Sequence, residues 1–177
     1  MARTIRPATS ADAEACAAIY APYVRDTVIS FEAVPPSSAE MASRIEQSST
    51  RHAWLVMEDD DTEGDVMGYA YAGPYSARAA YDWSCEVSVY LRVGSRRTGA
   101  GRALYEALFG RLEERGFRTL VAGITEPNEA SSGLHRALGF RVVGTFRDIG
   151  FKDGAWHDVT RWQRCIGPDN EPPTDLA

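Results

Sequence analysis

The chain has 177 residues, of which 44% are hydrophobic and 25% are charged, and its formal net charge is −6. This length and composition are those of one ordinary globular domain with a core of its own. The acidic balance excludes a sequence-independent nucleic-acid binder, because such a protein needs a net basic surface to release counterions from phosphates.

The three cysteines Cys16, Cys85 and Cys165 are odd in number and widely spaced, so they predict neither a disulfide framework nor a metal site. The N-terminal residues lack an apolar signal region, and no apolar run approaches the roughly 20 residues of a membrane-spanning helix. We therefore expect a cytoplasmic protein without a metal cofactor. Residues 1–166 read as a single domain, and residues 167–177 read as a polar, proline-rich tail.

The N-terminal region predicts a strand and a helix. Residues 4–7 form the strand, and Thr9 to Asp12 resemble a capping box ahead of an alanine-rich helix that ends near Tyr23. In the connection that follows, Phe31 stands among polar neighbours. It either covers the core or lines a pocket, since binding groups concentrate on loops.

The next segment predicts a second helix and a hairpin. A serine at position 37 or 38 caps the helix, which runs to about residue 47 with apolar residues four positions apart. Strands are expected at residues 53–57 and 66–73, joined by a solvated acidic turn. His52 reads as a surface histidine.

One guanidinium, Arg78, lies in a connection between Pro74 and Trp83 that otherwise holds mainly small and aromatic residues. The plain interpretation is a surface arginine. An equally good one is bidentate recognition of a substrate carboxylate.

The strand expected at residues 83–91 alternates, with apolar side chains on one face and Glu86, Ser88 and Tyr90 on the other. A glutamate in mid-strand has poor β-propensity. It either faces solvent or, where it is shielded, needs a functional reason.

Two arginines and two glycines follow this strand in Arg96-Arg97-Thr98-Gly99-Ala100-Gly101 and lead into a helix with leucines four residues apart. Free amides at a helix start, glycines and guanidinium groups together form an anion site that suits a pyrophosphate. A P-loop is excluded because no Gly-Lys precedes Ser or Thr, and a dinucleotide fingerprint because Leu104 replaces its third glycine.

The remaining chain predicts a buried strand at residues 119–124 and a short helix that begins near Asn128 and is capped at its end by Gly139. A hairpin of residues 141–149 and 155–165 follows.

Two signatures carry a family resemblance. The residues from Arg96 to Gly101 match the Arg/Gln-x-x-Gly-x-Gly/Ala pattern of the GNAT acetyltransferases, and residues 128–140 resemble the family's second signature, Asn-x-x-Ser-x-x-Leu-His-x-x-Leu-Gly-Phe. Further segments are similar to the phosphinothricin N-acetyltransferase subfamily, namely residues 54–56, 69–74, 80–83, 138–140 and 150–159. The resemblance covers roughly residues 4–165.

The resemblance implies an α/β (α+β) GNAT fold, in which about four helices flank a mixed, mostly antiparallel, twisted seven-stranded sheet. The sheet is splayed between the fourth and fifth strands, where the co-substrate acetyl-CoA enters. The implied contacts with acetyl-CoA are made by Val89, Tyr90, Leu91, Arg96, Arg97, Thr98, Gly99, Ala100, Gly101, Arg102 and Asn128.

The resemblance also implies two catalytic residues. Acetyl transfer to an amine needs a neutral nucleophile, and Glu86 is the implied base that takes the proton, directly or through a water. His135 holds the place from which the departing thiolate is assisted, and its acid or base role stays open. By itself, a histidine beside Leu134 and Leu138 reads as a structural residue.

The implied substrate site has Arg78 as a clamp on the α-carboxylate, in a pocket shaped by Phe31, Tyr75, Tyr81 and Ser88. Ser76 stands where some relatives carry a basic residue, so recognition of a phosphinate or a similar anionic group stays open.

The sequence thus predicts an N-acetyltransferase for the α-amino group of phosphinothricin, methionine sulfoximine or a similar glutamate-like small molecule, with neither nucleic acid nor membrane as partner. The alternatives are a GNAT enzyme for another amine, such as a protein N-terminus or a polyamine, and a non-catalytic acyl-CoA-binding regulator. In the subfamily the C-terminal hairpin packs across a two-fold axis, so a homodimer is the implied assembly.

Overall fold

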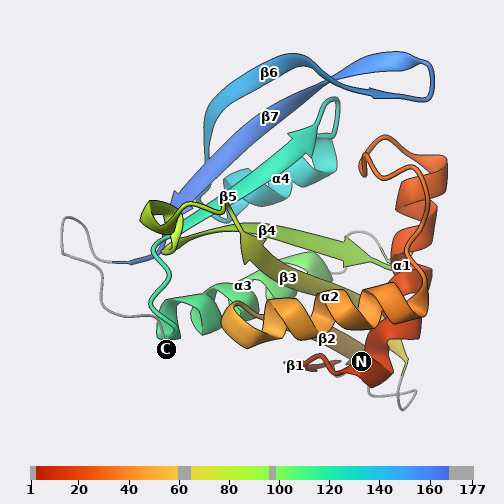
Figure 1. Cartoon of the computed structure of the whole chain (residues 1–177), viewed down its shortest axis with the longest axis vertical. Helices are drawn as coiled ribbons and strands as arrows, with labels where there is room; N and C mark the ends of the chain where they lie inside the picture. Colours follow the sequence, from red (N-terminus) through yellow and green to blue (C-terminus); the bar gives the residue numbers. More distant parts are fainter. Residues whose placement is uncertain (1–2, 60–64, 96–98, 168–177) are drawn as a thin grey trace.

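The computed structural model describes residues 3–59, 65–95 and 99–167. A seven-stranded sheet in the order β1-β2-β3-β4-β5-β7-β6 crosses the molecule (Figure 1). Its neighbouring strands are antiparallel, except that β4 and β5 are parallel. This is the predicted mixed, mostly antiparallel sheet.

The elements follow the predicted order along the chain. The strands are β1 (Arg3–Pro7), β2 (Trp54–Asp59), β3 (Val66–Pro74), β4 (Ser84–Leu91), β5 (Thr119–Thr125), β6 (Arg141–Lys152) and β7 (Ala155–Cys165). The α-helices of the described residues are α1 (Ala13–Asp26), α2 (Ser38–Arg51), α3 (Ala100–Glu114) and α4 (Glu129–Ala137).

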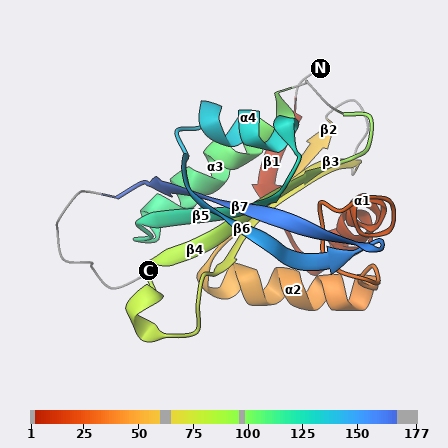
Figure 2. The same cartoon turned by 90° about the horizontal axis from the view of Figure 1, so that it is seen from above.

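Each face of the sheet has its own hydrophobic core. Helices α3 and α4 cover one face, and α1 and α2 cover the other (Figure 2). Cys85 and Val87 of β4 belong to the core under α3. Because side chains alternate along a strand, Glu86 and Ser88 project from the opposite face, as predicted.

The sheet splays between β4 and β5. These strands pair over only three residues each, 84–86 against 119–121. Beyond Glu86, β4 continues along β3 as far as Leu91, while β5 continues along β7 as far as Thr125 (Figure 1). The predicted opening between the fourth and fifth strands is therefore confirmed, and Glu86 lies at its apex.

The C-terminal hairpin turns at Asp153 and Gly154, both of which have positive φ, 52° and 78°. A two-residue turn with positive φ at both positions matches the twist of its strands, which explains the Asp-Gly pair. Strand β6 runs three residues further than predicted, to Lys152. Large apolar side chains remain exposed on the hairpin, namely Val142, Val143, Phe146, Ile149, Phe151 and Trp156.

Two helices are longer than predicted because tertiary contacts satisfy their last turns. Helix α1 passes through Pro22, and its terminal carbonyl groups accept hydrogen bonds from Thr27 and Lys152. Helix α2 begins where predicted, with the Ser37 side chain accepting a bond from the Glu40 amide. It continues to Arg51, because the Ser49 carbonyl in its last turn accepts a bond from Nη1 of Arg115 at 3.3 Å and the buried Ser48 hydroxyl anchors the turn on the Ala72 carbonyl at 2.8 Å.

Two surface interpretations were wrong. His52 is buried, 6% exposed, and stacks on Phe117 with 5.0 Å between ring centroids. Burial lowers its pKa to about 4, and the positive charges of Arg51 and Arg115 act in the same direction. Glu58 belongs to β2 and pairs with Arg6 instead of standing in a solvated turn; the rest of that turn, residues 60–64, lies outside the described residues.

Within the described parts of the chain, none of the helices combines the length and the apolar character that crossing a bilayer requires. The predicted tail falls, apart from Gly167, outside the described residues.

Candidate active site

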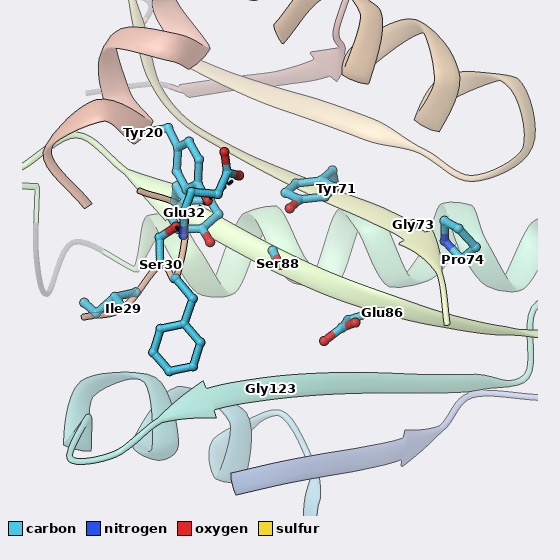
Figure 3. A pocket seen from close by; sticks show the side chains of 12 residues that line it. Tyr20, Ile29, Ser30, Glu32, Tyr71, Gly73, Pro74, Glu86, Ser88 and Gly123 are labelled. Atoms are coloured by element: carbon cyan, nitrogen blue, oxygen red, sulfur yellow. Dashed lines mark hydrogen bonds between the residues drawn. The ribbon is translucent and has the colours of Figure 1, made fainter. Parts of the chain in front are cut away.

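Glu86 borders a hollow of about 450 Å³ at the apex of the splay. Glu86 and Gly123 face each other from β4 and β5, while Tyr20, Ser30 and Glu32 stand at the other end (Figure 3). The lining residues come from α1, the segment after it and strands β3 to β5, namely Tyr20, Ile29, Ser30, Phe31, Glu32, Tyr71, Gly73, Pro74, Glu86, Ser88, Tyr90 and Gly123.

A second hollow of about 360 Å³ shares four lining residues with the first and extends toward the C-terminal hairpin. The shared residues are Ile29, Phe31, Glu86 and Gly123, and the others are Thr125, Phe146, Ile149, Val159 and Arg161. Glu86 thus has open space on two sides.

The two glutamates of the first hollow differ in their partners. Arg44 donates to both carboxylate oxygens of Glu32, at 2.7 and 3.0 Å, and the Tyr20 hydroxyl donates to the same carboxylate at 3.0 Å. These bonds, the Arg44 contact above all, lower the pKa of Glu32. Glu86 accepts one bond from the described residues, from Nη1 of Arg161 at 2.5 Å. Glu86 is therefore the carboxylate left available for chemistry.

The hairpin holds the wall formed by the segment after α1. Nζ of Lys152 donates to the carbonyl oxygens of Val24, Thr27 and Ser30 at 2.6, 2.8 and 2.7 Å. Phe31 lies directly over Gly150, where a Cβ atom would come within 2.1 Å of its ring. Phe31 thus lines both hollows. Of the two roles that the sequence left open, core cover and pocket lining, the structure shows the second.

Beyond Glu86, the edge of β4 that faces the splay is not paired with another strand of the described residues. The hydroxyl groups of Tyr105 and Tyr23 donate to the carbonyl oxygens of Val87 and Leu91, at 3.4 and 2.7 Å. Since backbone groups alternate in direction along a strand, the N–H and C=O of Val89 point to this same edge. An extended chain could pair with it as an added strand.

The glycine-rich loop ends in a sharp turn into α3. Gly99 precedes the helix with φ of 78°, a left-handed conformation that favours glycine, while Ala100 and Gly101 are buried in the first turn. Arg102 is exposed, pairs with Glu106 and donates to the Ala137 carbonyl at 3.1 Å. The other predicted members of the anion site, Arg96, Arg97 and Thr98, lie outside the described residues.

Asn128 caps α4 as predicted, since its side chain accepts a bond from the Ser131 amide at 3.1 Å. His135, on the same helix, is 3% exposed and contacts Phe140 and Tyr105 edge to face. Burial lowers the pKa of His135, against the opposing effect of its bond to Ser131. The histidine therefore sits behind the splay in neutral form.

The hydrogen bonds of His135 define its tautomer. Its Nδ1 lies 2.8 Å from the carbonyl oxygen of Ser131, so Nδ1 carries the proton and donates it. The other nitrogen, Nε2, is then an acceptor and lies 3.4 Å from the hydroxyl of Tyr105. Tyr105 thereby links His135 to the backbone of β4.

The predicted substrate residues fall in two groups. Phe31 and Ser88 line the first hollow, and Ser88 also bonds the phenol of Tyr71. Arg78, Tyr75 and Tyr81 lie on the exposed loop after Pro74, where the two tyrosine rings meet edge to face at 5.3 Å. This loop borders the hollow at Pro74, but these three side chains do not line it.

The sequence argument missed Arg161, which stands beside Glu86, and Tyr105, which stands beside His135. A signal for Arg161 was present in Gly123, because a glycine inside a strand often marks the close approach of another group. Among residues 3–59, 65–95 and 99–167, no group of three or more histidine, cysteine, aspartate or glutamate side chains is placed to hold a metal ion.

Comparison with known proteins gives one consistent result. The family model of the acetyltransferase (GNAT) domain matches residues 5–161. The phosphinothricin N-acetyltransferase of Streptomyces viridochromogenes is 44% identical over 160 residues, which are 90% of this chain and 86% of that relative. The L-methionine sulfoximine/L-methionine sulfone acetyltransferase of Pseudomonas aeruginosa is 33% identical, with 98% and 100% of the two chains covered.

A solved structure has the same fold over almost the whole chain. It is that of a GNAT superfamily phosphinothricin acetyltransferase from Sinorhizobium meliloti in complex with AcCoA. The TM-score is 0.92 at 39% identity, with 98% of this chain and 94% of that chain covered.

Proposed function

The chain belongs to the GNAT acetyltransferase family and is an acetyl-CoA-dependent N-acetyltransferase similar to the phosphinothricin N-acetyltransferases, and from this premise we propose its substrate and mechanism. The substrate is the α-amino group of phosphinothricin, methionine sulfoximine or a similar glutamate-like compound. The observation that carries the proposal is the place of Glu86, which stands in a hollow at the apex of the splay beside an open strand edge.

The splay suits the binding of acetyl-CoA. The backbone from Val89 to Leu91 would hold the pantetheine arm as an added strand, chiefly through Val89, whose N–H and C=O face the opening while those of Tyr90 face β3. The turn at Gly99 and the amides that begin α3 would receive the pyrophosphate, together with Ala100, Gly101 and Arg102. Arg96, Arg97 and Thr98 are assigned to this site from the sequence pattern alone, and the assignment of Asn128 to acetyl-CoA binding rests on the family resemblance. When bound, acetyl-CoA supplies an activated acetyl group as a thioester.

Glu86 is the proposed general base. Its carboxylate attracts the substrate ammonium and takes one proton from it, directly or through a water, which frees the nitrogen lone pair for attack on a carbonyl carbon. The carbon–sulfur bond then breaks and the thiolate leaves, to be neutralised by the second proton that the nitrogen loses as the amide forms. A base with one hydrogen-bond partner keeps lone pairs directed into the hollow, as this role requires.

His135 assists the leaving group through Tyr105. Because its Nδ1 proton is donated to Ser131, the neutral imidazole has no proton on Nε2 to give. The Tyr105 hydroxyl lies 3.4 Å from both Nε2 and the Val87 carbonyl oxygen, so these two acceptors compete for its one proton, and we expect that proton to turn to the thiolate as the carbon–sulfur bond breaks. His135→Ala should lower kcat about tenfold or more, and an unchanged kcat/KM would remove this assignment.

The remaining substrate contacts come from Phe31 and Ser88 in the hollow and from the loop of Tyr75, Arg78 and Tyr81 at its border. Arg78 is proposed to bind an acidic group of a substrate that reaches out of the hollow, because a guanidinium can bind a carboxylate bidentately. A homodimer fits the exposed apolar side chains of the β6–β7 hairpin, which a second copy would cover. Sedimentation of the wild type and of Phe151→Asp tests that assembly, and a wild-type monomer would contradict it.

Thiol release from acetyl-CoA in the presence of a panel of amines tests the proposed function. The panel contains L-phosphinothricin, L-methionine sulfoximine, spermidine and an unacetylated peptide. We expect the highest kcat/KM with the two amino acids. Preference for the peptide or spermidine would indicate another substrate class, and acetyl-CoA binding without thiol release would indicate a regulator.

A further inference from the structure

Three strands bring a guanidinium onto the proposed base. Arg161 of β7 is the register partner of Gly123 of β5, and its side chain passes over this glycine to reach Glu86 of β4. A Cβ atom at position 123 would lie 3.0 Å from Nη1 of Arg161 and 3.4 Å from Oε1 of Glu86. The missing side chain of Gly123 thus leaves the path open along which the two charged groups meet.

The surroundings of Arg161 leave most of its binding capacity unused. Its guanidinium has five N–H donors, and among the described residues it makes one hydrogen bond, to Glu86. The hollow that it lines is otherwise mainly apolar, with Ile29, Phe31, Phe146, Ile149 and Val159. A guanidinium that faces an apolar hollow is a strong attractor for an anion, because few competing polar groups surround it.

The pair of Glu86 and Arg161 is complementary to the zwitterion of an α-amino acid. Such a substrate carries its ammonium and its carboxylate on one carbon atom, so the two charges are as close together as those of the pair. On binding, the ammonium would pair with Glu86 and the carboxylate would pair with Arg161. Two ion pairs would then replace the one between Glu86 and Arg161.

We propose that Arg161 is a specificity-determining residue that binds the α-carboxylate of the substrate beside the base. The inference rests on the proposed function and deepens it, because it makes a free α-carboxylate a requirement of the substrate class. It also changes the role expected of Arg78. That residue, exposed on the loop after Pro74, is left for the second acidic group of a glutamate-like compound.

The test compares L-phosphinothricin with its α-carboxamide, which keeps the amine and the side chain but lacks the α-carboxylate. We expect Arg161→Met to lower kcat/KM for the acid roughly 100-fold and for the amide only a few-fold. Arg161→Lys should restore part of the preference for the acid. Arg111→Met is the matched control, since Arg111 pairs with Glu114 on the surface of α3, and it should behave as the wild type.

A second variant perturbs the Arg161 side chain by a substitution at a neighbouring residue. Gly123→Ala adds a methyl group 3.0 Å from Nη1, the end of a flexible side chain that can shift, so it should reduce the acid-to-amide preference without unfolding the protein. Equal losses with the acid and the amide in Arg161→Met would overturn the inference, because Arg161 would then serve only to position Glu86. A wild type that acetylates amines but no α-amino acid would overturn the proposed function as well.

Discussion

Two clusters of arginine and carboxylate groups lie on the sheet, and they differ in how fully their hydrogen bonds are used. At the N-terminal edge, Arg6 donates to both oxygens of Asp12, at 2.9 and 2.7 Å, and to Glu58 at 3.1 Å. Asp12 also accepts bonds from the amide and hydroxyl of Thr9. In the hollow, Glu86 and Arg161 share a single bond.

The difference separates a structural cluster from a functional one. The Arg6 cluster buries Asp12, which is 5% exposed, and ties β1 to β2 and to the start of α1, so the Arg6 donors and both Asp12 oxygens are engaged within the protein. The Glu86–Arg161 pair, which makes one hydrogen bond within the described parts of the chain, keeps donors and acceptors beside open space. Breaking the first cluster should therefore cost stability, and breaking the second should cost activity.

The largest expected effect on folding comes from Arg6→Met. This change leaves the buried carboxylate of Asp12 without its counter-charge, so the free energy of unfolding should fall by about 3 kcal/mol. Urea denaturation measures it, with Arg25→Met as the control because Arg25 lies exposed near the end of α1. An unchanged midpoint would show that the cluster does not stabilise the fold.

The second effect concerns pH. His52, with an ordinary pKa near 6.5, has a pKa of about 4 in the folded chain. As the pH is lowered, His52 therefore binds its proton at a higher pH in the unfolded chain than in the folded chain. The stability that neutral His52 contributes above pH 6.5 is lost as the pH falls toward 4. His135 shifts in the same direction.

The loss due to His52 should be about 3 kcal/mol by pH 4. His52→Phe keeps the stacking on Phe117 and should flatten the fall in unfolding free energy between pH 6.5 and 4, measured by urea denaturation at several pH values. An unaltered slope would show that groups other than His52 cause the pH dependence of the unfolding free energy. The contact with Arg6 lowers the pKa of Asp12, so the contribution of Asp12 is lost only at still lower pH.

The smallest effect is expected where the hairpin meets the wall of the hollow. Gly150→Ala places a methyl group where the ring of Phe31 lies, so Phe31 must move and substrate binding should weaken. We expect KM for the amino acid to rise about fivefold with little change in thermal stability. A changed KM for acetyl-CoA with an unchanged KM for the amino acid would contradict the placement of Phe31 in the substrate site.

The local part of this comparison was predictable from sequence, and the long-range part was not. Alternation along β4 placed Glu86 on the face opposite Cys85 and Val87, and the serine before α2 and Gly139 marked helix ends, because each depends on neighbouring residues. The contact of Arg161 with Glu86 depends on the register between β5 and β7, which no local pattern sets. The burial of His52 likewise depends on its packing against distant Phe117.

The most direct test of the account replaces one glutamate of each cluster by glutamine. With acetyl-CoA and L-phosphinothricin, Glu86→Gln should lower kcat roughly 100- to 1,000-fold with an unchanged melting temperature. Glu58→Gln should lose about 1 kcal/mol of stability and keep kcat within about twofold of the wild type. Wild-type turnover by Glu86→Gln, or an equal loss of activity in both variants, would contradict the assignment of Glu86 as the base.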